Sequence, residues 1–282
     1  MDPLISINTL AYEGYDLTTA LEEIAKIGIR HVELGFTRGY TEGLSEGYFS
    51  EVSAKKINHL FADLSLSSVA LAAHTDLTTN DAVDELKRRL DFGKSLDVKI
   101  VHTKVGARAA RKQFEKNIQP IADYAESLDM IIALENPAEG TDQIISSGQT
   151  GAEIIKTIGR KSVKLNYDFG NAFTYSKGKI DPAVDYKEAL PYACHLHLKD
   201  LKQVDDGWEF PHIGGGVVDY DTIFEELCAE EKLLPLSIEQ LYSYKVSKDL
   251  IVHRMQRPPS LSQISTNLKR SIAYVQEAFK AC

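Results

Sequence analysis

The sequence has few cysteines and no long apolar run. Its three cysteines, Cys194, Cys228 and Cys282, are too few and too scattered for a disulfide framework or a cysteine metal site. No segment approaches the roughly 18 consecutive apolar residues of a membrane-spanning helix. Residues 1–4 lack the basic and apolar regions of a secretory leader. These absences predict a reducing, cytoplasmic location and no membrane partner.

An excess of basic residues is also absent. The chain carries 32 lysines and arginines against 41 aspartates and glutamates, a formal net charge of −9. A general nucleic-acid-binding protein normally presents a basic face. The composition therefore argues against nucleic acid as a partner, whereas a small substrate held by a few local cations stays compatible with it.

Short apolar segments typical of strands alternate with helical segments along all 282 residues, without a linker or low-complexity tract. The expected strands lie at residues 4–10, 30–36, 68–73, 99–105, 131–135, 163–168, 195–199 and 235–239. The expected helices lie at about residues 16–27, 50–64, 80–96, 111–128, 150–158, 181 onward, 220–231 and 260–279. Eight such alternations predict an α/β fold, a single (β/α)₈ TIM-barrel domain over residues 1–282.

Three connections are longer than a barrel requires. They cover residues 37–49, 201–219 and 240–260, and each follows a strand. Connections that follow strands lie at the carboxyl-terminal face of a barrel, where barrel enzymes build their active sites. The sequence therefore places the functional site at this face.

The segment 195–200 alternates polar and apolar residues with a period of two. His195, His197 and Lys199 therefore share one face of the expected strand, and the two leucines between them share the other. Imidazoles on the inward face of a barrel strand suit a site at the barrel mouth, where a ligand or a metal ion binds. Lys199 on that face suits either a substrate contact or a structural ion pair.

Three further strands end on a carboxylate, at Glu135, Asp168 and Glu239. Each acid falls on the less apolar face of its strand. Together with the strand of His197, these are the fifth to the eighth strands, which are consecutive, so their ends should lie side by side. One acid at a strand end is more often a helix cap than a metal ligand. Three carboxylates and an imidazole brought together would repel one another unless a cation neutralised them. The pattern therefore predicts one divalent ion, with Mn²⁺ favoured and Mg²⁺, Co²⁺ or Zn²⁺ as alternatives.

These residues carry a family resemblance over nearly the whole chain. The motifs are Glu135-Asn136, Asp168-Phe169-Gly170-Asn171, the segment 195–200, Ile238-Glu239 and the glycine-rich segment 214–220. They resemble the motifs of the xylose-isomerase-like barrel superfamily of sugar and sugar-phosphate isomerases and epimerases. The resemblance implies a catalytic divalent metal held by Glu135, Asp168, His197 and Glu239. It also implies that Glu135 and Glu239 move a proton next to a carbonyl, through a metal-stabilised enediolate.

The resemblance further predicts which side chains bind the substrate. They share a place at strand ends or in the loop after the seventh strand, and they are Glu33, His74, His102, Asn171, Lys199 and His212. For the strand-end residues, the alternative is a buried, hydrogen-bonded side chain.

Two departures from the family pattern bear on the substrate. Asn171 stands where many relatives have a histidine, and relatives acting on ketopentose phosphates resemble this chain in having an asparagine there. Residues 214–216 are three glycines, which suit either a phosphate cradle or a tight turn. Phosphorylation of the sugar therefore stays open at this stage.

Three classes of enzyme use such a site. An isomerase or epimerase of a small ketose, aldose or sugar phosphate is favoured, and a lyase or dehydratase of a keto-sugar or keto-cyclitol is the alternative. An abasic-site endonuclease shares several of the residues. Against it stand Asn171, the lack of an Asp-x-His pair near His212 and the net charge of −9. A homo-oligomer is compatible with Trp208 and Phe210, which suit a cover over the site or a contact with a second chain.

Overall fold

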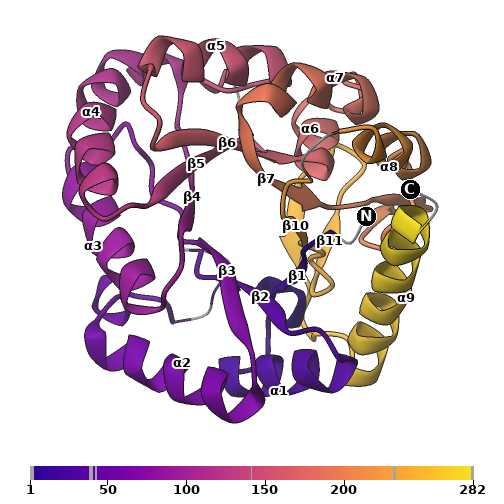
Figure 1. Cartoon of the computed structure of the whole chain (residues 1–282). Coiled ribbons are helices and arrows are strands. Elements are labelled where there is room, and N and C mark those ends of the chain that lie inside the picture. Colours follow the sequence, from indigo (N-terminus) through magenta and orange to yellow (C-terminus); the bar gives the residue numbers. More distant parts are fainter. Residues whose placement is uncertain (1–2, 38–40, 42, 141, 231–232, 281–282) are drawn as a thin grey trace.

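A computed structural model describes residues 3–37, 41, 43–140, 142–230 and 233–280. Eight parallel strands close into a barrel in the order β1-β10-β7-β6-β5-β4-β3-β2 (Figure 1). The strands are β1 Ile5–Asn8, β2 His31–Gly35, β3 Ser67–Ala72, β4 Ile100–Lys104, β5 Ile131–Glu135, β6 Val163–Asp168, β7 Ala193–Leu198 and β10 Leu236–Ile238. The predicted (β/α)₈ barrel is confirmed, and each predicted strand overlaps an observed one.

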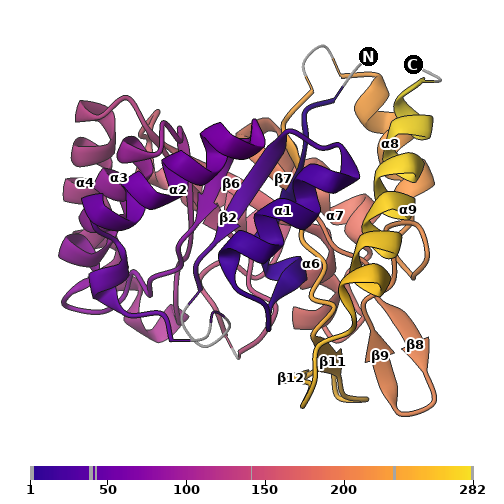
Figure 2. The ribbon, with the colours of Figure 1, turned by 90° about the horizontal axis from the view of Figure 1, so that it is seen from below.

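Helices surround the barrel (Figure 2). They are α1 Leu17–Ile27, α2 Glu51–Leu64, α3 Ala82–Ser95, α4 Arg111–Ser127, α5 Gly148–Ile158, α6 Phe169–Tyr175, α7 Pro182–Ala189, α8 Tyr220–Cys228 and α9 Leu261–Lys280. Short 3₁₀ turns are η1 Thr9–Tyr12, η2 Glu46–Tyr48, η3 Arg108–Ala110 and η4 Leu190–Tyr192. In the part of the chain that the structure describes, no helix combines the length and the apolar character needed to cross a membrane.

The local sequence explains where the first helix begins and ends. The Asp16 side chain accepts a hydrogen bond from the Thr19 amide, which is the usual N-cap arrangement. Gly28 ends α1 with φ at +98°, a backbone conformation that is unfavourable for residues other than glycine. The boundaries predicted for this helix therefore follow directly from its two cap residues.

Two features of the long connections differ from the prediction. The short helix α6 begins immediately after β6, although no helix was expected before residue 181. The connections after β7 and β10 also contain a second sheet, in the order β12-β11-β9-β8. Its strands are β8 Lys202–Val204, β9 Gly207–Glu209, β11 Tyr244–Val246 and β12 Val252–Arg254. The connection at 37–49 includes residues 38–40 and 42, which lie outside the described residues.

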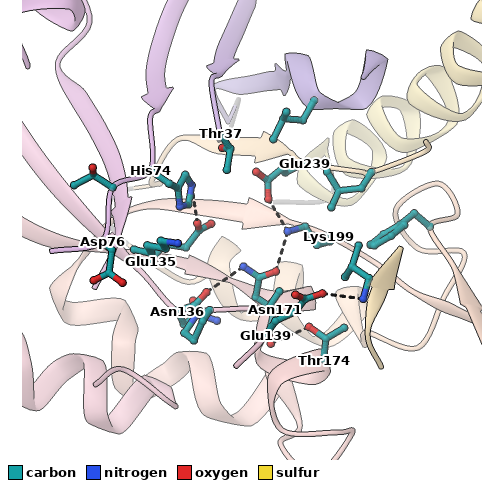
Figure 3. A pocket seen from close by; sticks show the side chains of 18 of the residues that line it. Thr37, His74, Asp76, Glu135, Asn136, Glu139, Asn171, Thr174, Lys199 and Glu239 are labelled. Carbon is teal, nitrogen blue, oxygen red and sulfur yellow. Dashed lines mark hydrogen bonds and ion pairs between the residues drawn. The ribbon is translucent and has the colours of Figure 1, made fainter. Parts of the chain in front are cut away.

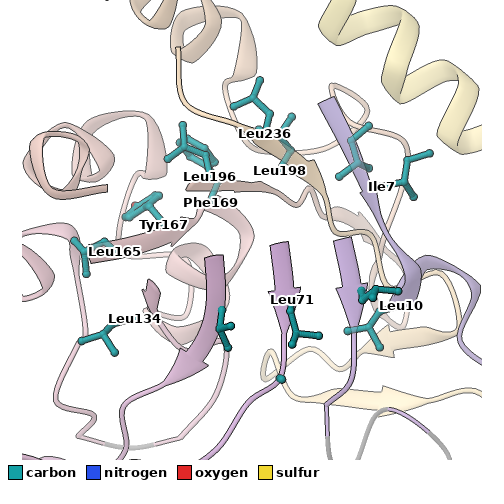
Figure 4. Close-up of a cluster of buried hydrophobic side chains, with 14 of the residues drawn as sticks. Ile7, Leu10, Leu71, Leu134, Leu165, Tyr167, Phe169, Leu196, Leu198 and Leu236 are labelled. Carbon is teal, nitrogen blue, oxygen red and sulfur yellow. The ribbon is translucent and has the colours of Figure 1, made fainter. Parts of the chain in front are cut away.

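The two faces of the barrel strands differ in chemistry. Outward-facing leucines such as Leu134, Leu165 and Leu196 are 0–3% exposed and belong to the main apolar cluster (Figure 4). Inside the barrel, a small apolar cluster comprises Ala70, Ile100 and Ala133, the other inward residues being largely polar. The apolar side chains that stabilise the fold thus lie between strands and helices, which leaves the interior available for polar groups.

Candidate active site

Four potential metal donors come together at the carboxyl-terminal ends of β5, β6, β7 and β10. Donor atoms of Glu135, Asp168, His197 and Glu239 all lie within 4.8 Å of one another, and the four side chains are buried. His197 Nδ1 is 2.7 Å from a Glu135 oxygen, 3.3 Å from a Glu239 oxygen and 3.6 Å from an Asp168 oxygen. The barrel thus brings together the four side chains that were each predicted to lie on the inward face of their own strand.

Asp168 and Glu239 each have one oxygen held by the protein. Asp168 Oδ1 accepts a hydrogen bond of 2.7 Å from the Asn171 amide and so caps α6. Glu239 Oε1 accepts a hydrogen bond of 3.1 Å from the Asn8 side chain on β1. Their second oxygens face the centre of the cluster, toward His197 and Lys199. Each carboxylate is therefore oriented before any ligand binds.

Glu135 is held from two sides. Its Oε1 accepts a hydrogen bond of 3.0 Å from Asn166 on β6, and its Oε2 lies 3.2 Å from His74 Nε2. Burial raises the pKa of Glu135 to about 7, against the opposing effect of His197. Burial also lowers the pKa of His74 to about 3, so that this imidazole is neutral at pH 7. The contact therefore pairs a neutral histidine with a carboxyl group that ionises near neutral pH.

Lys199 is the cation nearest to the cluster. Its ammonium lies 2.6 Å from a Glu239 oxygen and 2.9 Å from the side-chain oxygen of Asn171 (Figure 3). It also lies 2.7 Å from an Asp168 oxygen. Although burial opposes the charge, Asp168 and Glu239 hold the pKa of Lys199 above its usual range. Lys199 and the neighbouring His197 also hold the pKa of Glu239 below its usual range, despite burial. Of the two roles predicted for Lys199, a substrate contact or a structural ion pair, its contacts in this structure are those of an ion pair.

A cavity of about 520 Å³ opens beside this cluster. Figure 3 shows Glu135, Glu239 and Lys199 directed toward the same space, with Asn171 close by. The cavity is lined by Leu10, Thr37, His74, Thr75, Asp76, Thr79, Asp81, Glu85, Lys104, Glu135, Asn136, Pro137, Ala138, Glu139, Asn171, Thr174, Lys199, Phe210, Glu239, Leu241 and Val252. It is large enough for a small-molecule substrate.

The six side chains predicted to bind substrate separate into two groups. His74, Asn171 and Lys199 line the cavity. Glu33 and His102 do not, because they belong to the middle of β2 and β4 and are fully buried inside the barrel. Both positions were predicted as strand ends, whereas β2 and β4 continue beyond them.

His212 also lies away from this cavity. It lines a separate depression of about 370 Å³ together with Lys202, Tyr244 and Arg270. The second sheet and α9 contribute to that depression, so the loop after β7 directs His212 into it and not into the cavity. Phe210 of the same loop does line the cavity. Its role as a cover over the site or as a contact with a second chain stays a prediction.

The glycine-rich loop is filled by a side chain of the protein itself. Asp200 Oδ2 accepts the amide hydrogens of Gly214 at 3.1 Å and Gly216 at 2.8 Å. Its Oδ1 accepts those of Val218 at 3.2 Å and Leu201 at 2.9 Å. These amides are therefore already paired with an anion and are not free to cradle a phosphate, and the tight-turn alternative describes the loop.

Comparison with known proteins identifies the family. The profile of the xylose isomerase-like TIM barrel matches residues 21–251. The chain belongs to this family. The resemblance predicted from the motifs is thereby confirmed, and the membership supports an enzyme of the isomerase and epimerase type. No match was found among curated protein sequences.

Solved structures share the fold at low sequence identity. A xylose isomerase-like TIM barrel protein from Mycobacterium smegmatis in complex with magnesium has a TM-score of 0.71 and 16% identity, with 98% of each chain covered. D-allulose 3-epimerase from Methylomonas in complex with D-allulose has a TM-score of 0.70 and 16% identity, covering 99% of this chain and 98% of that one. The probable 3-DHS dehydratase from Bacillus anthracis has a TM-score of 0.65 and 15% identity, covering 84% and 93%.

The cluster fits the divalent ion that the family resemblance implies. Three carboxylates and one imidazole form an oxygen-rich donor set with one nitrogen, which suits Mn²⁺ or Mg²⁺. Among the described residues, buried His197 Nδ1 makes no hydrogen bond, although carboxylate oxygens surround it. A buried nitrogen without a hydrogen-bond partner is costly unless something binds it. The metal-ligand roles of these four residues stay a prediction.

Several asparagines that position the cluster were not predicted as site residues. Asn136 exchanges two hydrogen bonds with the backbone of Asp168, at 2.8 and 2.9 Å, and thereby joins the ends of β5 and β6. Asn166 supports Glu135, and its place on the same strand face as Asp168 is the signal that could have identified it. Asn8 ends β1, and no feature of the sequence indicated its contact with Glu239.

Proposed function

We propose that this protein is a divalent-metal-dependent isomerase or epimerase of a small, unphosphorylated keto- or aldo-sugar. The observation that carries the proposal is the placement of two carboxylates, Glu135 and Glu239, on the wall of one cavity beside a four-donor cluster. Moving a proton next to a carbonyl requires one group that removes it and another that returns it. Two carboxylates on one cavity wall supply both groups.

The ligands of the ion would be Glu135, Asp168, His197 and Glu239. When bound, the ion supplies positive charge that stabilises the negative charge developing on the substrate oxygens. Glu135 and Glu239 would accept and return the proton through their oxygens that face the cavity. Asn166 and Asn8 hold these two side chains through hydrogen bonds and so fix their directions.

The charges of the cavity favour a substrate without a phosphate. Six lining carboxylates, Asp76, Asp81, Glu85, Glu135, Glu139 and Glu239, face two lysines, Lys104 and Lys199. No arginine contributes to this wall in the described part of the chain. A bound divalent ion would leave the wall negative, so a phosphate would be repelled. The occupation of the glycine-rich loop by Asp200 supports the same choice.

A dehydratase is the second candidate. It would use the same proton removal and then expel a hydroxyl group instead of returning the proton. The likeness to the probable dehydratase from Bacillus anthracis supports this alternative only at the level of the fold. The two reactions differ in product, because dehydration removes water and leaves a new double bond. Mass spectrometry of the product distinguishes them.

An abasic-site endonuclease is less supported. The net charge of −9 and the acidic cavity disfavour the phosphate backbone of DNA. Asn171 contacts Lys199 and the Asn136 backbone, and so is engaged within the protein.

The test begins with isotope exchange. Purified enzyme is incubated in deuterium oxide with unphosphorylated ketoses, the corresponding aldoses and their phosphates. We expect deuterium on the carbon next to the carbonyl, and turnover of the unphosphorylated sugars only. Turnover restricted to the phosphates would contradict the proposed substrate class.

Variants then assign the two acids. Glu135→Gln and Glu239→Gln should each lower turnover by about 10²–10⁴-fold, the usual effect of losing a general acid or base. Glu188→Gln, at an exposed position on α7, is the control and should retain full turnover. If both site variants kept near-normal turnover and isotope exchange, the acid–base assignment would be wrong.

A further inference from the structure

Glu33 is a fully buried carboxylate that does not reach the cavity. It lies on β2 inside the barrel with 0% of its surface exposed, and it is not among the residues that line the cavity. An ionised carboxylate is costly to bury unless it is paired and hydrogen-bonded. Its partners therefore indicate why it is there.

The main partner of Glu33 is His197. The two oxygens of Glu33 lie 2.9 and 3.0 Å from His197 Nε2. A carboxylate only accepts hydrogen bonds, so Nε2 must carry the proton. Nδ1, on the opposite side of the ring, is the nitrogen that faces the cluster of Glu135, Asp168 and Glu239. A neutral imidazole protonated at Nε2 has its lone pair at Nδ1, as a metal ligand requires.

Glu33 is itself held from behind. His102 Nδ1 on β4 lies 3.2 Å from Glu33 Oε1. The ring of His102 also packs against those of His195 and His197, with centroids 4.6 and 5.0 Å apart. Contacts from two other strands thus fix the direction of the carboxylate on β2.

We propose that Glu33 is a positioning residue that fixes the tautomer and orientation of His197, so that Nδ1 is presented to a metal ion. This inference relies on the proposed metal site and goes beyond it, since it assigns a role to a residue outside the cavity. Carboxylates behind a ligating histidine typically change metal affinity by 10–100-fold when mutated.

A second buried cation is the competing interpretation of the same residues. Donor atoms of Glu33, His102, His195 and His197 lie within 4.8 Å of one another. A cation bound at His197 Nε2 would displace the proton that Glu33 accepts. With Nδ1 also bound, the ring would have to become an imidazolate. The hydrogen-bond geometry at Nε2 therefore favours the positioning role.

The test uses metal binding rather than turnover. Mn²⁺ is titrated calorimetrically into metal-free wild type, Glu33→Gln and Ser237→Ala. The Glu33→Gln substitution keeps the size of the side chain and removes its charge. Ser237 is as buried as Glu33 and lies on β10, the strand that pairs with the His197 strand β7. Its hydroxyl makes no hydrogen bond among the described residues, so it is the matched control. We expect one ion per wild-type chain, a dissociation constant raised about 10–100-fold in Glu33→Gln, and an unchanged constant in Ser237→Ala.

Nitrogen-15 NMR of histidine-labelled wild type provides a readout that a purely structural role would not change. With Mg²⁺ bound, His197 should be protonated at Nε2 and not at Nδ1. Protonation at Nδ1 would overturn the proposal even if Glu33→Gln failed to fold. So would unchanged affinity in Glu33→Gln, or two ions per wild-type chain with one lost in that variant. A wild type that binds no divalent ion would instead refute the proposed metal-dependent function, from which this inference starts.

Discussion

Asp168 contributes to the fold and to the site through different atoms. Its Oδ1 caps α6, and its Oδ2 accepts a hydrogen bond from Lys199 at the edge of the donor cluster. The helix-cap and metal-ligand interpretations of an acid at a strand end are therefore compatible. The same division holds for Glu239, where Asn8 takes one oxygen and the cluster takes the other.

Lys199 forms ion pairs with Asp168 and Glu239, two carboxylates that are also predicted to bind the metal ion. Lys199→Met would leave Asp168 and Glu239 buried with less compensating charge, and removal of one partner of a buried ion pair costs about 3–5 kcal/mol. A bound divalent ion supplies compensating charge. We therefore expect a large loss of stability in the metal-free variant and a smaller loss when Mn²⁺ is present. Urea denaturation with and without Mn²⁺ measures both.

The control for this variant is Lys161→Met at an exposed position. It should leave the free energy of unfolding unchanged, both with and without Mn²⁺. Equal losses for Lys199→Met with and without Mn²⁺ would mean that the ammonium and the ion act on different carboxylates.

The elements around the barrel were predictable to different degrees. The barrel strands were predicted because their apolar residues pack outward against helices, which produces a long, periodic pattern. The strands of the second sheet have only three residues each, too few for a period to be recognised. Two of the pairings are local, β8 with β9 and β11 with β12, but the sheet is completed by pairing between residues far apart in the chain, such as Lys245 with Glu209. Sequence alone carries little signal for such distant pairing.

The site residues were also predictable only as far as local periodicity reaches. Glu135, Asp168, His197 and Glu239 were predicted to converge because strand parity determines which face a side chain takes. Glu33 and His102 were placed at the cavity because the sequence does not give their depth inside the barrel. Depth depends on where each strand ends and on the stagger between strands.

Gly207 tests whether the second sheet shapes the cavity. Its φ is +147°, and an added Cβ would lie 2.2 Å from the backbone oxygen of Val246 on the paired strand β11. Gly207→Ala should therefore disturb the β9–β11 pairing, with local strain of about 1–3 kcal/mol. Because Val252 of β12 and Phe210, directly after β9, line the cavity, we expect KM to rise more than kcat falls.

Steady-state kinetics and a thermal melt measure these effects. Gly47→Ala is the matched control, since its added Cβ would meet only the Ser45 hydroxyl at 3.8 Å. An unchanged KM for Gly207→Ala in a folded protein would show that the sheet does not shape the substrate site.

At the scale of the whole molecule, the barrel interior concentrates negative charge that only a few cations balance. Glu33, Glu135, Asp168 and Glu239 are buried there, and Lys199 is the buried lysine among them. A chain built in this way should gain stability from a divalent ion, because the ion binds the folded state and not the unfolded one. The family resemblance predicts catalysis by such an ion, and the charge distribution predicts a thermodynamic effect that needs no substrate.

Removal of the ion should therefore lower the melting temperature. At a free Mn²⁺ concentration about 100 times the dissociation constant, one site adds about 2.7 kcal/mol to the free energy of unfolding. Differential scanning calorimetry over a series of Mn²⁺ concentrations, compared with chelated protein, measures this gain. Asp168→Asn is the control, because an asparagine oxygen can still cap α6 while the charge of one predicted ligand is lost. We expect a concentration-dependent rise in the wild type and a much smaller one in the variant. An equal rise in both would place the stabilising ion elsewhere in the molecule, since a site that includes Asp168 cannot bind equally well without its charge.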